Sequence, residues 1–323
     1  MSRNLSENLE FWMTNLPDTL KDIPVINLAI PGSHDSMTYE MRALSPVAPD
    51  AEGCVHILHK FIPCIVKRWA VTQKLSLMNQ LRSGIRYFDF RISFRPHDKK
   101  YYFVHGLYCE EIINSLKDVR DFLDNHPEEV IIVDIQHMYQ FEEKNHAELM
   151  GILEDILGDK IWIRDGNLSA WTAREAARTG KQLVIIYRYP FINGRFWTSD
   201  DWPTPWPNQT NVTKLKEHLE SGLLTRNPHC GFVTQCVLTP SISYTVPRFF
   251  SSLQRTCARK VFQKLLSWIA SQKPGSWDQG MSPTINVVLA DFIDIQDSKF
   301  CKVVVDLNLK LLNEKDVIME SSA

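Results

Sequence analysis

The stretch NLAIPGSHDSMTY, residues 27–39, joins the end of an apolar run to two adjacent ionisable residues. Residues 25–30, VINLAI, predict a buried strand because they form an almost continuous apolar segment. Pro31 and Gly32 mark its end, and His34 and Asp35 follow at once. Ionisable side chains at the end of a buried strand need polar partners, and other strand ends along the sequence offer them.

Six further apolar stretches predict strands: residues 86–93, 101–107, 129–135, 182–189, 231–238 and 285–293. Most are continuous rather than alternating, which is typical of parallel strands covered on both faces. Helical periodicity occupies residues 110–129, 145–158, 257–275 and 300–315, while residues 191–210 read as a long loop. This alternation predicts an α/β fold with a parallel sheet, either open and doubly wound or a β/α barrel. No GxGxxG or Walker loop is present, so the barrel is favoured.

Composition narrows the function classes. The chain has 323 residues and a net charge of −2, which disfavours a nucleic-acid partner. It has no secretory signal and no apolar stretch near the roughly 18 residues of a spanning helix, so a cytoplasmic location is expected. Its seven cysteines include no CxxC pair, which predicts free thiols and no zinc site. We expect one domain over residues 1–323, with a helical lead-in at 1–22 and a disordered tail at 314–323.

Polar side chains gather at the predicted strand ends, and the C-terminal ends of barrel strands share one mouth. In strand order they are His34 and Asp35, Asp89 and Arg91, His105, Gln136 and His137, Arg188, Gln235, and Asp291. Each has a structural explanation on its own. A strand-end histidine can serve as a hydrogen-bond partner, Asp89 and Arg91 as a buried ion pair, and Asp291 as a turn cap. One shared site would supply partners for all of them.

These residue types suit phosphoryl transfer between two oxygens. Two histidines can act as base and acid, and neighbouring carboxylates fix their tautomers and support their charge. An arginine presents a fork of donors that matches phosphate. The alternative is a metal site built from His34, Asp35, Asp89 and His105. Arg91, two residues from Asp89 on the same strand face, disfavours it because a fixed positive charge competes with a cation.

Three motifs carry a family resemblance. IPGSHDS (30–36), RYFDFRIS (86–93) and FVHGL (103–107) resemble the X-domain motifs of phosphatidylinositol-specific phospholipase C, most closely those of the small eukaryotic proteins that consist of little more than this domain. The resemblance extends from residue 27 to ADFI at 290–293. It implies a distorted, incompletely closed TIM-like barrel of the PLC-like phosphodiesterase type. It also implies cleavage of the phosphodiester between inositol and diacylglycerol.

The resemblance also implies roles for individual residues. His34 would be the general base on the inositol 2-hydroxyl, and His105 the acid that protonates the leaving oxygen. Asp35 would support His105, Asp291 would hold His34, and Arg91 and Asp89 would complete the catalytic set. Arg188 resembles a substrate-binding arginine of the bacterial enzymes, and Gln136 or His137 stands where those enzymes carry a lysine near the end of the fourth strand. From their positions at the mouth we expect Gln136, His137 and Gln235 to contact the substrate as well.

The same resemblance bears on cofactors and partners. Large signalling phospholipases of this kind hold calcium with an Asn after the first His, acidic residues in the second strand and a Glu ending the fourth. Here Asp35, Asp89, Arg91 and Gln136 stand at those places. We therefore expect no cofactor and calcium-independent activity.

The expected partners are a phosphoinositide lipid and, transiently, a membrane surface. The candidate membrane contact is the loop with Phe196, Trp197, Trp202 and Trp206, and the alternative is that these side chains pack over the barrel side. The rival functions are a catalytically weak module that binds inositol phospholipids or a protein, and a metal-dependent phosphodiesterase of the same barrel type.

Overall fold

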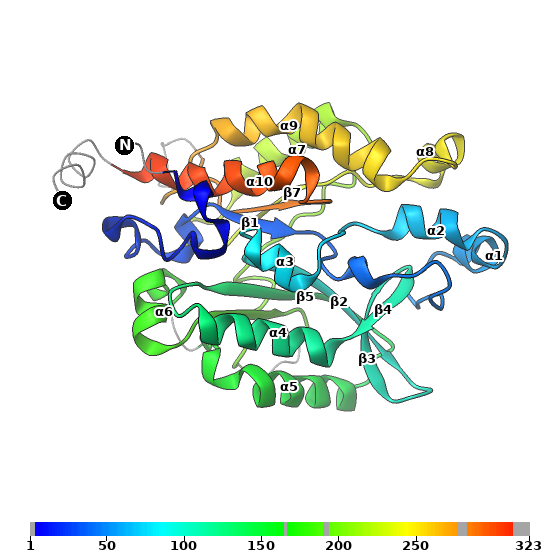
Figure 1. The fold of residues 1–323 in the computed structure, drawn as a ribbon, viewed down its shortest axis with the longest axis horizontal. Coiled ribbons are helices and arrows are strands. Elements are labelled where there is room, and N and C mark those ends of the chain that lie inside the picture. Colours follow the sequence, from blue (N-terminus) through cyan, green and yellow to red (C-terminus); the bar gives the residue numbers. More distant parts are fainter. Residues whose placement is uncertain (1–3, 165–166, 190–193, 277–282, 313–323) are drawn as a thin grey trace.

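The computed structural model describes residues 4–164, 167–189, 194–276 and 283–312, and contains one mixed sheet flanked by helices (Figure 1). The predicted tail at 314–323 lies outside the described residues. Within the described ranges, no helix has the length and apolar character to span a membrane. The strands are β1 Ile30–Ser33, β2 Tyr87–Arg95, β3 Lys100–His105, β4 Leu107–Glu111, β5 Ile131–Tyr139, β6 Leu183–Tyr187, β7 Val233–Cys236 and β8 Val287–Ala290.

Six of these strands run parallel in the order β7-β8-β1-β2-β5-β6. The terminal strands β6 and β7 do not pair with each other among the described residues. The sheet is therefore barrel-like and not closed, as predicted. Gly32 in β1 fits this curvature, because a Cβ there would lie only 3.0 Å from Cδ1 of Tyr87 and 3.2 Å from Cγ1 of Val287.

The third predicted strand differs from a barrel strand. Residues 101–107 divide into β3 and β4, and β3 runs antiparallel to β2, with Ile92 opposite Phe103 and Arg95 opposite Lys100. The physical reason is the four-residue connection 96–99, which is long enough for a hairpin but far too short for a parallel crossover. The hairpin still brings His105 back to the mouth, because β2 extends past the mouth before the chain reverses.

The first predicted strand starts too early. Residues Val25–Asn27 form a 3₁₀ turn, and β1 begins only at Ile30. Pro24 precedes the turn, and the amide of Asn27 donates to the carbonyl of Pro24 at 2.8 Å. A short apolar run cannot distinguish a strand from a buried turn by periodicity alone.

Helices cover both sides of the sheet, with α4 and α5 below it and α7, α9 and α10 above it in Figure 1. The helices are α1 Gly53–Phe61, α2 Pro63–Ala70, α3 Leu77–Arg82, α4 Ile112–Asn125, α5 Glu143–Leu157, α6 Ala173–Thr179, α7 Val212–Thr225, α8 Ile242–Thr245, α9 Arg259–Ser271 and α10 Ile295–Asp306. The four predicted helical segments correspond to α4, α5, α9 and α10. The described part of the predicted loop, residues 194–210, has no helix or strand.

The N-terminal segment packs under the end of the sheet opposite the mouth. It forms 3₁₀ turns at Leu5–Glu7, Leu9–Phe11 and Asp18–Leu20. Trp12 is fully buried beside the barrel interior, and Thr14 donates to Glu129, whose carboxylate pairs with Arg86 at 2.8 Å. Both partners of this ion pair are fully buried, so it fixes the floor beneath the strands.

Candidate active site

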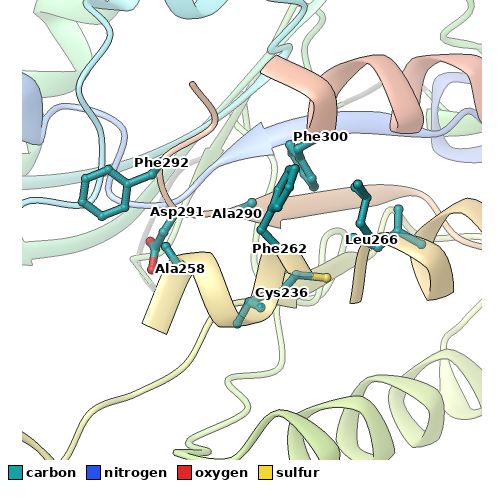
Figure 2. A pocket seen from close by; sticks show the side chains of 10 residues that line it. Cys236, Ala258, Phe262, Leu266, Ala290, Asp291, Phe292 and Phe300 are labelled. Atoms are coloured by element: carbon teal, nitrogen blue, oxygen red, sulfur yellow. The ribbon is translucent and has the colours of Figure 1, made fainter. Parts of the chain in front are cut away.

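His34 and Asp291 form a buried pair at the mouth. In the parallel pairing of β1 with β8, Ser33 lies opposite Ala290, so the next residue on each strand is His34 and Asp291. Nδ1 of His34 lies 2.8 Å from Oδ1 of Asp291. Figure 2 shows Asp291 among the side chains that line a small cavity, whose other lining residues, among them Phe262 and Phe292, carry no charge. Because these surroundings are apolar, Oδ1 of Asp291 depends on the imidazole of His34 for its hydrogen bond.

Arg91 joins the two aspartates of the mouth. Its Nε contacts Oδ1 of Asp35, and its Nη2 lies 3.6 Å from Oδ2 of Asp89. Nη2 also lies 3.1 Å from Nε2 of His34. Asp35 has a φ of 41°, which aspartate tolerates, and this turn lets its amide donate to Oδ2 of Asp89 at 3.1 Å. One guanidinium thus bridges both carboxylates and the imidazole.

His105 faces the same carboxylate from the other side. Its Nε2 lies 3.1 Å from Oδ2 of Asp35, and its Nδ1 lies 2.6 Å from the carbonyl oxygen of Ala70 at the end of α2. Both ring nitrogens of His105 therefore face hydrogen-bond acceptors, which fixes the orientation of the ring. The ring centroids of His34 and His105 are 6.3 Å apart. A small group between them could exchange protons with both.

The charges of the site favour a protonated His34. Burial lowers the pKa of His34, but the carboxylates of Asp35 and Asp291 and the Asp291 hydrogen bond outweigh it, raising the pKa to about 9. Burial raises the pKa of Asp35, yet Arg91, His105 and His34 offset this and hold it below its usual value. The 3.1 Å contact with Arg91 suits a neutral ring that accepts at Nε2, whereas a cationic ring would donate to Asp35 at 3.3 Å.

His34, Asp35 and Asp89 also offer three ligand atoms within 4.8 Å of one another. This trio is the predicted alternative metal site, with His105 turned toward Asp35. The guanidinium of Arg91 already contacts both carboxylates. Calcium prefers about six to eight oxygen ligands. The donor set is therefore small, and its negative charge is largely compensated.

Arg188 belongs to a second polar cluster, centred on Asp134 inside β5. Arg188 donates from Nε and Nη2 to the two carboxylate oxygens of Asp134, at 2.9 and 2.7 Å. Asp134 is fully buried and also accepts from the hydroxyl of Tyr87 at 2.6 Å. Burial raises the pKa of Asp134, and Arg188 opposes that shift. This bidentate pair fixes the guanidinium of Arg188 at the side of the mouth.

Known proteins resemble this chain over nearly its whole length, although a scan against protein-family models finds no match. PI-PLC X domain-containing protein 2 of Mus musculus is 35% identical over 304 residues, which cover 92% of this chain and 87% of that protein. PI-PLC X domain-containing protein 3 of Homo sapiens is 33% identical and covers 92% of both chains. The chain belongs to the PI-PLC X domain-containing protein family.

Solved structures agree on the fold of this X-domain chain. The phosphatidylinositol-specific phospholipase C from Listeria monocytogenes superposes with a TM-score of 0.61, is 18% identical, and covers 93% of this chain and 98% of that one. The enzyme of the same name from Staphylococcus aureus gives a TM-score of 0.64 at 18% identity, with 95% and 99% covered. At this identity the likeness establishes that the chain shares the barrel-like fold of these structures and nothing finer.

The remaining predicted residues of the X-domain mouth hold a loop in place. Opposite β2, Phe90 pairs with Ile135 and Arg91 with His137, so Gln136 is the extra residue of a β-bulge. Its amide donates to Asp134 at 3.0 Å and to the Thr204 hydroxyl at 3.1 Å.

Gln235 and His137 are the last two of the predicted residues at the mouth. The Gln235 amide donates to the carbonyls of Thr204 and Pro205, at 3.0 and 3.3 Å. The structure therefore gives both glutamines loop partners. His137 is exposed, with its ring 6.0 Å from that of Tyr139.

The loop held this way places Trp206 over His34. The indole stacks on the imidazole with ring centroids 5.4 Å apart and an interplanar angle of 29°, and Trp206 is 42% exposed. Its three companions in the predicted membrane loop, Phe196, Trp197 and Trp202, are at most 4% exposed. They pack into the core, which is the alternative that the sequence left open.

Sequence reasoning missed two buried residues of this X-domain site. Asp134 was visible as an acid within the apolar run EVIIVDI, which called for a buried partner. Gln73 left no comparable signal. Its amide nitrogen donates to the carbonyls of His34 and Ala290, at 3.0 and 2.9 Å, and so ties the ends of β1 and β8 together.

Proposed function

We propose that the protein is a phosphoric diester hydrolase that cleaves phosphatidylinositol-type lipids into diacylglycerol and an inositol cyclic phosphate. The observation that supports this most is the arrangement of two histidines around one carboxylate–guanidinium pair. His34 backs onto Asp291, His105 backs onto a carbonyl, and their rings are 6.3 Å apart with Asp35 between them. Such an arrangement suits a displacement that takes a proton on one side and gives one on the other.

In the proposed reaction, neutral His34 takes the proton of the inositol 2-hydroxyl at Nε2. The freed oxygen attacks phosphorus, and the bond from phosphorus to the diacylglycerol oxygen breaks. His105 gives its Nε2 proton to that leaving oxygen. Asp291, 2.8 Å from Nδ1, stabilises the imidazolium that forms on His34. The products are diacylglycerol and a 1,2-cyclic inositol phosphate.

Arg91 would supply the electrostatic stabilisation without a divalent metal. Its guanidinium can donate to the non-bridging phosphate oxygens as their charge grows. Its contacts with Asp35 and Asp89 neutralise the carboxylates that a calcium ion would need. We therefore propose that turnover is independent of calcium.

A second candidate is a module that binds inositol phospholipids and turns them over slowly. The observation that favours it is the contact of His34 with the carboxylates of Asp291 and Asp35, at 2.8 and 3.3 Å, which raises the pKa of the imidazole to about 9 and so disfavours a neutral base at pH 7. The indole of Trp206, stacked on the same imidazole, also covers the proposed base. Rates that rise steeply with pH would favour the hydrolase over this candidate.

The proposed membrane contact is an apolar rim at the mouth end of the molecule, where α1, α2 and α8 extend past the sheet (Figure 1). Two segments form the rim: the α2 arm, which consists of α1 and α2, and a second arm, which consists of α8 and the turn after it. The two arms are in contact, since Nε1 of Trp69 in α2 donates to the carbonyl of Phe249 at 3.2 Å. The α2 arm also reaches the active site through the Ala70–His105 contact. The exposed apolar side chains of this rim are Leu44, Ile57, Phe61, Ile242, Val246 and Phe250.

Basic side chains accompany this apolar rim. Lys60 and Arg68 lie on the first arm, and the exposed Arg248 lies on the second. Apolar side chains with nearby cations suit the interface of a bilayer that contains anionic lipids. The rim replaces the tryptophan loop as the proposed membrane contact, with Trp206 as the only member of that loop retained.

The test of the proposed function is hydrolysis of phosphatidylinositol in vesicles by the purified protein. Phosphorus NMR would identify the cyclic inositol phosphate, and His105→Ala would serve as the matched variant. The proposal requires cyclic product from the wild type and little from the variant. A folded wild type that binds the vesicles but releases no inositol phosphate at any pH would refute the hydrolase and leave the binding module.

A further inference from the structure

A second polar cavity lies beside the proposed active site. It has a volume of about 240 Å³ and opens between the start of α9 and the turn that follows β8. That volume is several times the roughly 30 Å³ share of one water molecule. Its polar lining consists of Lys74, Arg259, Asp294 and the three glutamines Gln254, Gln263 and Gln296. We call it the Lys74–Arg259 cavity.

The charges of this cavity are unpaired. Neither Lys74 nor Arg259 has an acidic partner within 4 Å among the described residues, unlike Arg86, Arg91 and Arg188. The charge of Lys74 lies 5.8 Å from the ring centroid of Phe292, and both cations are exposed. Two cations lining one cavity favour a phosphate group there.

One acceptor in the lining is also unsatisfied. Oδ1 of Asp294 is buried and has no hydrogen-bond partner within the part of the chain that the structure describes. A buried carboxylate oxygen that lacks a donor is costly, and a ligand hydroxyl would provide one. The glutamine amides can both donate and accept, which also suits hydroxyl groups. Phe262 and Ile295 add an apolar wall, which suits the carbon face of a sugar-like ring.

Two backbone irregularities border the cavity. Gln296, Asp297 and Ser298 have φ values of 52°, 54° and 53°, a left-handed turn made of three non-glycine residues. The segment Gln254–Ala258 forms a π-helix ahead of α9. Both conformations are uncommon because they cost free energy, and both occur preferentially at functional sites. Each of them contributes a glutamine to the lining, so the irregular backbone and the unpaired charges meet at one place.

The cavity is adjacent to the catalytic pair and separate from it. Asp294 follows Asp291 by three residues, and Lys74 follows Gln73. Gln73 connects the two regions, since its Oε1 accepts from the amide of Ile293 at 3.3 Å while its amide donates to the carbonyl of His34. Phe262 lines both this cavity and the narrow one behind Asp291. None of the proposed catalytic side chains lines the Lys74–Arg259 cavity.

We propose that the Lys74–Arg259 cavity binds a phosphorylated polyol, with the phosphate on Lys74 and Arg259 and a hydroxyl on Asp294. This chemistry is shared by a free inositol phosphate and by the headgroup of an inositol lipid. The choice of inositol as the polyol rests on the proposed function, whereas the anion site rests on the cavity itself. The protein then holds two inositol phosphate groups at one end of the barrel, one for reaction and one for binding.

The test is isothermal titration calorimetry of the full chain with myo-inositol 1-phosphate, with myo-inositol and inorganic phosphate as separate probes. Lys74→Ala/Arg259→Ala removes both cations of the cavity. Lys264→Ala/Lys299→Ala removes two exposed lysines of α9 and α10 that do not line it, and is the matched control. Both pairs are also made with Arg91→Ala, so that binding in the active site is weakened equally in each.

The proposal requires that the ester bind the Lys74→Ala/Arg259→Ala variants about 10-fold or more weakly than the controls. It also requires that the ester bind the controls at least about 10-fold more tightly than inorganic phosphate or inositol does. Equal affinity in the two variant pairs overturns the site, and equal affinity of inorganic phosphate overturns the polyol assignment.

Sedimentation with phosphatidylcholine vesicles, with and without phosphatidylinositol, separates the two sources of the ligand. If the Lys74→Ala/Arg259→Ala variants lose binding only to the vesicles that contain phosphatidylinositol, the ligand is the lipid headgroup. If they lose binding only to the soluble ester, the ligand is the free inositol phosphate. The outcome is distinct from that of the hydrolase proposal. An inactive protein with cation-dependent ester binding would retain this site and refute the hydrolase, and an active protein without such binding would do the reverse.

Discussion

Replacing Asp291 with asparagine perturbs the charge that supports the proposed base. Oδ1 of Asp291 lies 2.8 Å from Nδ1 of His34, and its charge and hydrogen bond both raise the pKa of that imidazole. His34 acts as a base only when neutral, so kcat/KM of the wild type should rise with pH and pass its half-maximal value near pH 9. Removing one carboxylate at this distance should lower the pKa of His34 by about 1–2 units. The acidic limb of the profile should move to lower pH by the same amount.

The Asp291→Asn variant should also be slower on the plateau. Asparagine cannot stabilise the imidazolium that forms as the proton is taken, and loss of general base assistance costs about 10²–10⁴-fold in rate. The profile is therefore expected to be both shifted and lowered. The assay is release of inositol cyclic phosphate from mixed micelles, followed from about pH 5 to about pH 10.

The matched control is Asp297→Asn, which alters a carboxylate that pairs with Lys302 on the surface of α10. It should keep the wild-type profile. If Asp291→Asn is folded and its acidic limb coincides with that of the wild type, then Asp291 does not set the protonation of the base. It would then be a structural partner of the turn after β8.

Three further predictions follow from the same contacts. His34→Ala or His105→Ala should lower turnover by about 10²–10⁴-fold while the melting temperature stays near that of the wild type, and wild-type rates in either would exclude acid–base roles for that residue. Arg91→Lys keeps the charge but loses the fork, so turnover should fall by about 10²-fold or more, and excess EDTA should leave the wild-type rate unchanged; restoration of a chelated enzyme by calcium would contradict this. Glu129→Ala leaves Arg86 buried without its carboxylate partner and should lower the free energy of unfolding, measured in urea, by about 3–5 kcal/mol. A decrease of less than about 1 kcal/mol would contradict this prediction.

The sequence predicts the parallel framework well because buried parallel strands are continuous apolar runs. Six of the seven predicted strand regions overlap parallel strands of the sheet, and the predicted incomplete closure agrees with the lack of pairing between β6 and β7 among the described residues. The errors have local causes. Val25 and Ile26 are apolar because they lie in a buried turn rather than a strand. The antiparallel direction of β3 depends on the length of the connection at 96–99. The spacing of apolar residues reveals neither the buried turn nor the direction of β3.

The residues of the mouth could be predicted because strand ends converge, whereas the pairing of Asp291 with His34 and of Asp35 with His105 was expected only from the family resemblance. His34 and Asp291 come together through the register of β1 against β8, which places Ser33 opposite Ala290. The position of Trp206 depends on a loop anchored by hydrogen bonds from Gln136 and Gln235 to backbone and hydroxyl groups. Such contacts join segments far apart in the chain and leave no periodic signal. Asp134 is visible in the sequence as an acid within an apolar strand that needs a buried partner, but the sequence does not indicate that this partner is Arg188.

The contact between Arg91 and His34 connects the resting state of the site to the proposed reaction. Nη2 of Arg91 lies 3.1 Å from Nε2 of His34, so whenever His34 is neutral the guanidinium occupies the atom that must accept the substrate proton. A phosphodiester in the mouth would offer Arg91 anionic oxygens, which are stronger acceptors than a neutral imidazole. Turning the guanidinium toward the phosphate would therefore free Nε2 for the inositol hydroxyl. On this reasoning, Arg91 makes the appearance of a free base conditional on a bound phosphate, and Arg91→Lys should impair the base as well as the stabilisation of the phosphate charge.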